Sequence, residues 1–492
     1  MAGLGILVIL ADLVIGRKRW LSALALAGLV VPLWFVLAQL SELPGGLGSF
    51  GTDNLVPATS VLADSLSVDR FGTFLNLLVV ATLALVFLAS VSYVNALSRL
   101  QGEFYGLMLL SASGMMLLAS ATELITIYVA LELTTLPLVA IAAFLPNSRS
   151  SEAGMKFLVI GAISSGLTLY GMALLYGFSG STTLSGIALA LSGPVSNEIP
   201  FGSYAVLIGV AVLTAGIAFK LSSVPSQIKA VAFALLLRVL YSGFLIFDDN
   251  WGMLLAVLAA LSMTVGNLVA IAQSNIRRLL GYSTIAHAGY ILVGVAAVTQ
   301  GVAAGDDGGL FTTFGPSSVL FYLVAYSAAN LTAFFAILAI HSRIGSDLIE
   351  DYGGVFTRYP FVAIALALAL VALIGVPPTG IFIGKIYLFL AAVKSDLAWL
   401  AILGAVNSVI SAYYYIRIIR VMFLSPESEA VAAMGYRNSS TASGLNRNGR
   451  FSLTVVALTV TAVCTVLLGI AFEPILQAAE SAVTALPGVL AP

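Results

Sequence analysis

Three ionisable side chains stand almost alone inside long apolar stretches of this sequence. Glu132 lies in ITIYVALELTTLPL, Lys220 lies in IAFKLSSVP, and Lys385 follows a double proline in ALIGVPPTGIFIGKIYLF. A lysine removed from water binds its proton less tightly, and a nearby carboxylate reverses that effect. A carboxylate and amines placed in this way predict a chain of groups that load and release protons. The alternative is a buried ion pair that only fixes packing.

The composition indicates the medium in which these charges lie. Of the 492 residues, 60% are hydrophobic and only 9% are charged, and the mean hydropathy is +1.07. A soluble protein of this length needs more charge to cover its surface. The chain is therefore predicted to be a polytopic membrane protein.

The apolar stretches predict the number of membrane crossings. A helix needs about 20 mostly apolar residues to cross a bilayer. The N-terminus lacks a basic region followed by a short apolar core and a cleavage site, so we expect no removable signal peptide. We predict an all-α protein with fourteen transmembrane helices, near 3–16, 21–40, 72–97, 104–120, 124–145, 156–179, 203–225, 228–247, 252–273, 282–300, 317–341, 360–393, 397–423 and 452–474.

Lys and Arg residues are spread unevenly over the predicted loops. If the N-terminus lies outside, fourteen of them fall in one set of loops and only Arg70 and Lys394 in the other. Positive charge collects in cytoplasmic loops. Both termini are therefore predicted on the non-cytoplasmic side of the membrane.

Seven charges remain at membrane depth. Each costs about 2.5 to 3.5 kcal/mol on insertion scales, so each is first a candidate for function. Asp12 and Arg417 lie near helix ends, where we expect their side chains to reach the interface. Arg238 keeps its proton at any ordinary pH, which suits a fixed counter-charge better than a proton carrier. The seven are Asp12, Glu132, Lys220, Lys229, Arg238, Lys385 and Arg417.

The chain has few side chains that could hold a redox centre or a metal. Its one cysteine is Cys464, in TAVCTV, and its two histidines are His287 and His341. These residues cannot supply the ligands of a haem, an iron–sulfur cluster or a structural zinc ion. The glycine cluster at 45–51 does not follow a strand and open a helix, so it does not predict a nucleotide site. We expect no cofactor, no metal and no nucleic acid on this chain.

Prolines interrupt two of the predicted helices close to a lysine. The seventh contains LSSVP after Lys220, and the twelfth contains GVPPTGIFIGK with Lys385. Proline frees backbone groups, which are tolerated at membrane depth only where they line a cavity or are buried in protein. Broken helices at corresponding places are typical of inverted repeats. We therefore predict two inverted five-helix repeats, helices 4 to 8 and helices 9 to 13, each containing a broken helix.

These repeats divide the chain into predicted domains. Each domain is assigned from the predicted spans alone. The N-terminal three-helix segment covers 1–97, the first repeat 104–247, the second repeat 252–423, a cytoplasmic-side loop 424–451, and the C-terminal helix and tail 452–492.

Six stretches of this sequence resemble the N-type subunits of respiratory complex I. These are the antiporter-like membrane subunits of the proton-pumping NADH:quinone oxidoreductase. GVPPTGIFIGK and QSNIRRLLGYSTIAHAGY are more similar to the N-type subunits than to the L-type and M-type subunits or the Mrp antiporters. The stretches cover most of 104–423 and read ELITIYVALELTTLPLVAIAAF, GMKFLVIGAISSGLTLYGMALLYG, GNLVAIAQSNIRRLLGYSTIAHAGYILVG, FYLVAYSAANLTAFFAI, GVPPTGIFIGKIYLF and NSVISAYYYIRI.

The resemblance implies a role for each charged candidate. Glu132 and Lys220 would form a modulating pair, Lys229 would be the central relay, and Lys385 would be the terminal site on the path to the other side. His287 lies in STIAHAGY, where it would either connect the central polar chain or serve as a hydrogen-bonded core histidine.

One stretch departs from the family pattern. Similar subunits carry a further segment between FKLSSVP and the lysine of the eighth helix, but here Pro225 is followed at once by SQIKAVAF. Either the chain has lost this segment, or the segment was left out and the numbering was closed over the gap. Bonded neighbours have Cα atoms about 3.8 Å apart, so the distance from Pro225 to Ser226 distinguishes the two. The short join leads us to expect Lys229 at the membrane face.

The resemblance also implies what this chain does and what it works with. It implies a proton-translocating subunit of an enzyme complex, with no redox chemistry on this chain. NADH, FMN, iron–sulfur clusters and quinone would belong to partner subunits. The expected partners are M-type and K-type membrane subunits, the peripheral redox arm and lipid, in a bacterial inner membrane. The alternatives are a subunit of a secondary Na+/H+ antiporter of the Mrp type and a purely structural scaffold.

Overall fold

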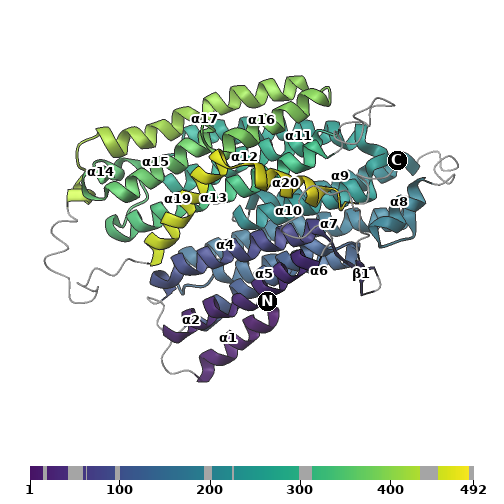
Figure 1. Ribbon diagram of the computed structural model, residues 1–492, viewed down its shortest axis with the longest axis horizontal. Helices are drawn as coiled ribbons and strands as arrows, with labels where there is room; N and C mark the ends of the chain where they lie inside the picture. The colour runs from purple at the N-terminus through teal and green to yellow at the C-terminus, as the bar shows by residue number, and fades with distance from the viewer. Residues whose placement is uncertain are drawn as a thin grey trace.

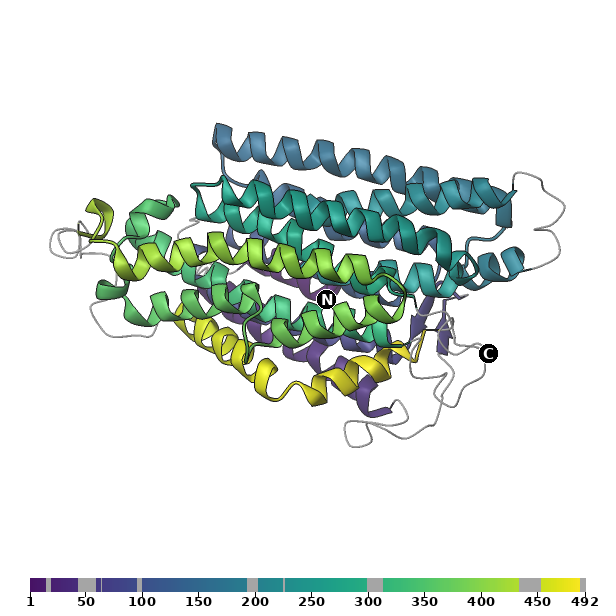
Figure 2. The same ribbon diagram turned by 90° about the horizontal axis from the view of Figure 1, so that it is seen from above.

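The chain forms a bundle of long helices that run side by side (Figure 1). The computed structural model describes residues 1–14, 19–42, 59–62, 64–94, 100–192, 202–223, 226–298, 313–432 and 453–486. The sheet in this part of the chain is a single antiparallel hairpin. The turned view in Figure 2 shows α7 along one edge of the bundle and α19 and α20 along the opposite edge.

The helices and strands follow the apolar stretches of the sequence. In chain order they are α1 (Ala2–Val14), α2 (Arg19–Gly28), α3 (Val30–Glu42), β1 (Thr59–Val61), β2 (Leu66–Val68), α4 (Arg70–Val94), α5 (Gln101–Ser120), α6 (Leu124–Ala142), α7 (Ser148–Ser179), α8 (Leu184–Ser192), α9 (Gly202–Ser223), α10 (Ser226–Gly243), η2 (Leu245–Phe247), α11 (Asp248–Ile271), α12 (Ile276–Ala296), α13 (Phe314–Ile344), η3 (Ile349–Tyr352), α14 (Val355–Arg358), α15 (Pro360–Ile374), α16 (Gly380–Lys394), α17 (Ala398–Leu424), α19 (Leu453–Ile470) and α20 (Glu473–Val483).

Length and composition make this an all-helical polytopic membrane protein. Among the described residues, ten helical stretches are long and apolar enough to cross a membrane, and three shorter apolar helices accompany them. Every stretch predicted as a membrane span overlaps a helix. The sequence analysis did not predict α8 and α20, which are too short to cross a bilayer.

Glycines let neighbouring helices approach until their backbones touch. A Cβ on Gly114 of α5 would lie 2.6 Å from the backbone nitrogen of Thr134 on α6. Cβ atoms on Gly171 and Gly216 would lie 2.5 and 2.6 Å from backbone atoms across the α7–α9 contact. Small residues at helix contacts are the usual basis of close packing in membranes. They fix α6, α7 and α9 against their neighbours.

One end of the bundle carries the β-hairpin, and we call it the hairpin end. Leu66 of β2 pairs with Ala121 in the turn between α5 and α6, and Glu123 in the same turn pairs with Thr183 after α7. The guanidinium of Arg70 donates to the hydroxyl of Ser481 on α20 over 2.8 Å. These contacts join segments that are distant in sequence at a single end.

The opposite end is rich in arginine, and we call it the basic end. Asn275, before α12, pairs with Leu348, after α13. Arg277 and Asp347 form an ion pair of 2.9 Å, and Arg358 and Glu427 form one of 3.0 Å. The hydrogen bond from Arg358 holds the pKa of the Glu427 carboxyl below its ordinary value.

The two predicted helix breaks have different outcomes. In the twelfth predicted span, α15 ends at Ile374 and α16 begins at Gly380, so the helix is broken at the double proline. The break predicted near Pro225 lies outside the described residues, and so does the Pro225–Ser226 distance. Lys229 is buried inside the bundle, because α4, α5, α8, α9, α12 and α13 all pack against α10; its expected depth at the membrane face stays a prediction.

Candidate functional site

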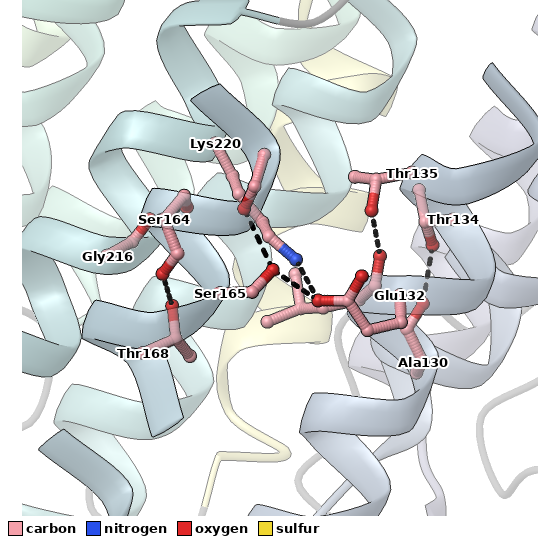
Figure 3. A network of polar contacts seen from close by, with 11 residues as sticks. Ala130, Glu132, Thr134, Thr135, Ser164, Ser165, Thr168, Gly216 and Lys220 are labelled. Atoms are coloured by element: carbon pink, nitrogen blue, oxygen red, sulfur yellow. Dashed lines mark hydrogen bonds and ion pairs between the residues drawn. The ribbon is translucent and has the colours of Figure 1, made fainter. Parts of the chain in front are cut away.

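An ion pair between Glu132 and Lys220 lies where α6, α7 and α9 meet (Figure 3). The Nζ atom of Lys220 lies 2.7 Å from Oε1 of Glu132. Lys220 is buried, whereas the Glu132 side chain keeps 23% of its surface exposed. Ser165 of α7 donates a hydrogen bond to the same carboxylate oxygen. The structure thus brings the two predicted residues together and adds a serine that the sequence analysis did not single out.

Backbone contacts between α7 and α9 place Lys220 against Glu132. The hydroxyl of Ser164 donates to the carbonyl of Gly216 over 2.6 Å (Figure 3). Gly216 lies one helical turn before Lys220, so both residues lie on the same face of α9. Because Gly216 has no side chain, α9 approaches α7 closely enough for Lys220 to reach across to α6. Ser165, next to Ser164, then completes the contact to the carboxylate.

Arg238 on α10 forms a second buried ion pair, with Asp69. Two guanidinium nitrogens lie 2.8 and 2.9 Å from the two carboxylate oxygens, and the side chains are 2% and 3% exposed. Asp69 also accepts from the backbone nitrogen of Gly72 over 2.7 Å, at the start of α4. The guanidinium carbon lies 5.0 Å from the centre of the Phe71 ring. Arg238 therefore has a fixed partner, in line with the predicted counter-charge.

The sequence analysis missed Asp69, although one local signal points to it. Asp69 stands directly before the helical run RFGTF, where an acidic side chain often caps the first turn of a helix. Its distance from Arg238 in the sequence hides the pairing. Two buried charges that satisfy each other in this way are compatible with the bundle interior.

His287 lies in the middle of the polar interior, on α12. Its Nδ1 atom lies 2.7 Å from the hydroxyl of Tyr322 on α13, and its Nε2 atom lies 3.4 Å from the hydroxyl of Tyr415 on α17. His287 is thus hydrogen-bonded on both ring nitrogens, to hydroxyls from two other helices.

Lys385 is held by groups that carry no net charge. Its Nζ atom donates to the carbonyl of Ile374 over 2.9 Å and to the hydroxyl of Ser408 over 3.0 Å. It also lies 4.4 Å from the centre of the Tyr290 ring. Ile374 is the last residue of α15, so the helix break frees the carbonyl that accepts this hydrogen bond. In the part of the chain that the structure describes, no carboxylate contacts Lys385.

Three consecutive tyrosines at 413–415 divide between two faces of α17. From the sequence alone we expect them to pack between helices or to anchor an interface. Tyr413 is 64% exposed, whereas Tyr414 and Tyr415 are fully buried. Tyr415 contacts His287 and the hydroxyl of Ser283. Its hydroxyl therefore belongs to the polar interior and does more than fill space.

An amide cluster beside these tyrosines is a further feature that the sequence analysis missed. The amide nitrogen of Asn267 on α11 lies 3.1 Å from the amide oxygen of Asn407 on α17, and the Tyr414 hydroxyl donates to Asn267 over 3.0 Å. Asn267 and Asn407 have no charged neighbours in sequence, so nothing near them indicated a polar cluster. The cluster extends the polar interior from α12 to α11 and α17.

The remaining candidates lie apart from this polar interior. Asp12 on α1 is half-buried next to Gly102 of α5, and Arg417 on α17 is half-buried. His341 lies at the basic end, 2.9 Å from the carboxylate of Asp347. Cys464 is half-buried. Across the described ranges, no three His, Cys, Asp or Glu side chains are grouped so that they could hold a metal ion.

Comparison with known proteins identifies similar chains. The family model described as NADH:quinone oxidoreductase/Mrp antiporter, TM, matches residues 121–411. NADH-quinone oxidoreductase subunit N of Dehalococcoides mccartyi is 39% identical over 426 residues, covering 81% of this chain and 86% of that protein. NAD(P)H-quinone oxidoreductase subunit 2 of Gloeobacter violaceus is 37% identical over 514 residues, covering 98% of this chain and 91% of that protein.

Solved structures show a similar fold. A chain of respiratory complex I from Thermus thermophilus with bound aureothin has a TM-score of 0.69 and 26% identity, covering 96% of this chain and 98% of that chain. A chain of the Mrp complex from Dietzia sp. has a TM-score of 0.74 at 19% identity, covering 99% of this chain and 97% of that chain. The likeness to the Mrp chain shows the fold alone.

Proposed function

This chain belongs to the NADH:quinone oxidoreductase/Mrp antiporter family, among relatives named subunit N of NADH-quinone oxidoreductase, and from this premise we propose that it translocates protons in such a complex. Glu132, Lys220, Lys229 and Lys385 carry the protons. The observation that carries the proposal is the ion pair between Glu132 and the buried Lys220, which joins α6 to α9 inside the bundle.

The first step is the loading and opening of the Glu132–Lys220 pair. Two unit charges about 4 Å apart attract each other by about 4 kcal/mol at the effective dielectric of a protein, but by only about 1 kcal/mol in water. Hydration or separation of the pair therefore weakens the hold of Glu132 on the charge of Lys220. A membrane potential of 100 mV opposes each moving charge by about 2.3 kcal/mol, which is of the same size.

The middle of the path runs through α10, α12 and α13. A proton that leaves Lys220 is accepted by Lys229, which is buried on α10; this helix packs against α9, which carries Lys220, and against α12, which carries His287. His287 exchanges hydrogen bonds with the hydroxyls of Tyr322 and Tyr415, so proton transfer through the ring has partners on both nitrogens. Lys229 is the central relay, and His287 assists it.

Lys385 is the terminal site of the path. Its ammonium is stabilised by the freed carbonyl at the end of α15, where the helix dipole is negative, and by Ser408 and the Tyr290 ring. These neutral groups stabilise the charge less than a carboxylate would, so the proton leaves more readily. Release follows on the side opposite to that of loading.

We assign fourteen crossings to the fold, in two inverted repeats with the domain limits predicted above. In the first repeat the turn between α5 and α6 pairs with the segment after α7, through Glu123 and Thr183. In the second repeat the turn between α11 and α12 pairs with the segment after α13, through Asn275 and Leu348. The two pairings lie at opposite ends of the bundle, which supports an inverted relation. In this assignment α15 and α16 form one broken crossing.

We place the basic end on the cytoplasmic side and both termini on the other side of a bacterial inner membrane. The arginine content of the loops at the basic end supports this placement, since positive charge is enriched in cytoplasmic loops. The loop at 424–451 then faces the cytoplasm; residues 433–451 of it lie outside the described residues.

We assign the redox chemistry to partner subunits. NADH, FMN, iron–sulfur clusters and quinone belong to the partners, and the neighbours are the peripheral redox arm and M-type and K-type membrane subunits. The names of the relatives, which are subunits of NADH-quinone oxidoreductase, support this assignment.

The test is NADH-driven acidification of inverted membrane vesicles that carry Lys385→Ala, with quinone reduction and complex assembly measured in the same preparation. We expect the complex to assemble and acidification to fall at least as much as quinone reduction. A sodium pulse in the absence of NADH should cause no acidification; a response to sodium alone would point to a secondary antiporter. If assembly, turnover and acidification all match those of the unmutated complex, Lys385 is a structural charge and the proposed path is wrong.

A further inference from the structure

The backbone of the helix break touches Lys385 on one side. Gly375, the first residue after α15, has a φ of +85°, a conformation that side chains other than glycine rarely adopt. A Cβ at this position would lie 3.1 Å from Cδ and 3.3 Å from Nζ of Lys385. The absence of a side chain at Gly375 therefore leaves the space in which the Lys385 ammonium reaches the carbonyl of Ile374.

The same break also touches α19. A Cβ on Gly469 would lie only 1.9 Å from the carbonyl oxygen of Pro378, so the backbones of α19 and the break are in direct contact. A Cβ on Gly380 would lie 3.0 Å from Cβ of Leu468, which is also on α19. Two glycines thus let α19 lie directly against the break.

The rest of α19 is fixed to other parts of the bundle. Near its start, Thr454 donates to the carbonyl of Ala89 on α4 over 3.1 Å. Near its end, Thr465 lies 3.4 Å from the hydroxyl of Thr332 on α13. The chain then turns into α20, which buries Leu476, Ala479, Ala482 and Val483 against α4 and α13. Figure 1 shows α19 and α20 in yellow crossing the bundle, and α19 is therefore a fixed support rather than a loose terminal helix.

We propose that α19 is the support that holds the terminal proton site in register, with Gly469 and Gly380 as positioning residues for Lys385. The contact of Gly469 with Pro378 fixes the break so that the Ile374 carbonyl remains within hydrogen-bond distance of Lys385. Gly375 is the matching position on the lysine side. This inference rests on the proposed role of Lys385 in proton transfer.

The site is sensitive to small displacements because its acceptors are uncharged. Hydrogen bonds weaken steeply as their geometry departs from the optimum. A displacement of the break towards Lys385 changes both the Ile374 contact and the distance to Ser408. An ion pair such as Glu132–Lys220 tolerates such a shift better, because the attraction between full charges falls slowly with distance.

The experiment introduces one methyl group at a time into the assembled complex. Gly469→Ala meets a backbone oxygen at 1.9 Å, Gly380→Ala meets Leu468 at 3.0 Å, and the control Gly177→Ala on α7 meets nothing within 4 Å. NADH-driven acidification is measured per assembled complex and as a function of pH. We expect Gly469→Ala to reduce the rate more than twofold, Gly380→Ala to reduce it less, and Gly177→Ala to leave it unchanged.

The pH profile separates positioning from a general loss of stability. We expect the profile of the active Gly469→Ala or Gly380→Ala complex to shift towards lower pH, because Lys385 then has a poorer set of acceptors. Among the described residues, Tyr290 on α12 contacts Lys385. His287 on the same helix packs against Tyr290 and bonds to Tyr322 on α13 and Tyr415 on α17. These titratable groups stay the same in the variants, and α15 and α19 carry no charged residue. A merely structural defect would lower the amount of complex and leave the profile in place.

Each possible outcome either supports or overturns the proposal. If the rates and profiles of the three variants all match the unmutated complex, α19 does not position the site. If Gly469→Ala fails to assemble, the comparison of Gly380→Ala with Gly177→Ala decides. If both glycine variants fail to assemble while Gly177→Ala assembles, the glycines serve folding and the proposal is overturned. The Lys385→Ala complex is measured in parallel: normal acidification there contradicts the proposed function itself, whereas a loss there with normal glycine variants contradicts only this inference.

Discussion

The two lysine sites of this chain hold their charges in different ways. Lys220 faces a full negative charge, the carboxylate of Glu132, at 2.7 Å. Lys385 faces the carbonyl of Ile374, the hydroxyl of Ser408 and the ring of Tyr290. The first site is assembled from side chains on three helices, α6, α7 and α9, and the second is assembled around the break between α15 and α16.

In the proposed path, this difference sets how each site releases a proton. The Glu132–Lys220 pair is controlled by one distance between two side chains, so a small change in that distance or in its hydration changes the charge balance. The Lys385 site is controlled by the position of a backbone segment, because its first acceptor is a carbonyl that the break exposes. The proposed path therefore begins at an ammonium group paired with a full negative charge and ends at one that only neutral groups hold.

Arg238 gives the contrast to both sites. It is buried and paired as Lys220 is, but its guanidinium cannot give up a proton and binds both oxygens of Asp69. The pair joins α10 to the start of α4 and so fixes the helix that carries Lys229. A buried charge in this bundle is thus not by itself a proton carrier.

The largest effect is expected where the full counter-charge is removed. Glu132→Gln leaves Lys220 buried without its carboxylate. Removing one partner of a buried ion pair lowers the free energy of unfolding by about 3 to 5 kcal/mol. We expect NADH-driven acidification per assembled complex to fall by about tenfold or more. The control is Glu152→Gln, which removes an exposed carboxylate paired with Lys156 on α7. Equal rates in the two variants would show that the Glu132–Lys220 pair does not control translocation.

A smaller effect is expected at the uncharged site. Ser408→Ala removes one of the acceptors of Lys385. A hydrogen bond to a charged group stabilises a protein by about 1.5 to 3 kcal/mol. Since Ile374 and Tyr290 remain, we expect a loss of about three- to tenfold in acidification. Ser342→Ala, on the exposed surface of α13, serves as the control. If Ser408→Ala lowers acidification more than Glu132→Gln does, the uncharged site limits translocation more than the ion pair does, which contradicts the comparison of the two sites.

The smallest effect is expected between the two sites. Tyr415→Phe removes a hydroxyl that lies 3.4 Å from His287, a long hydrogen bond, while the contact of His287 with Tyr322 remains. We expect acidification to fall about twofold, which corresponds to less than about 1 kcal/mol. Tyr413→Phe changes the same residue type two positions away on α17, at an exposed site, and should have no effect. If the two tyrosine variants behave alike, His287 does not use Tyr415 in transfer.

Much of the fold could be predicted because short stretches of the sequence specify it. Apolar runs of sufficient length specify membrane helices, and the double proline at 377–378 specifies the break between α15 and α16. The elements that escaped prediction are short or amphipathic, such as α20, whose buried face is recognisable only against α4 and α13.

The sequence by itself determined which residues needed an explanation. A charge in an apolar run is costly wherever the helix packs, so Glu132, Lys220 and Lys385 stand out without any structure. It also determined the break that supplies Lys385 with a carbonyl, because proline cannot donate the missing backbone hydrogen bond.

Only the tertiary structure determined which groups form ion pairs or hydrogen bonds with those charges. Ser165 and Ser408 reach their partners from other helices, and their local sequences resemble those of ordinary helix positions. Asp69 stands where a helix cap is expected, but its pairing with the distant Arg238 is visible only in the fold. The support of the break by Gly469 depends on the path of α19 across the bundle. These contacts follow from how helices pack against each other, and packing is a property of pairs of surfaces that no single stretch of sequence contains.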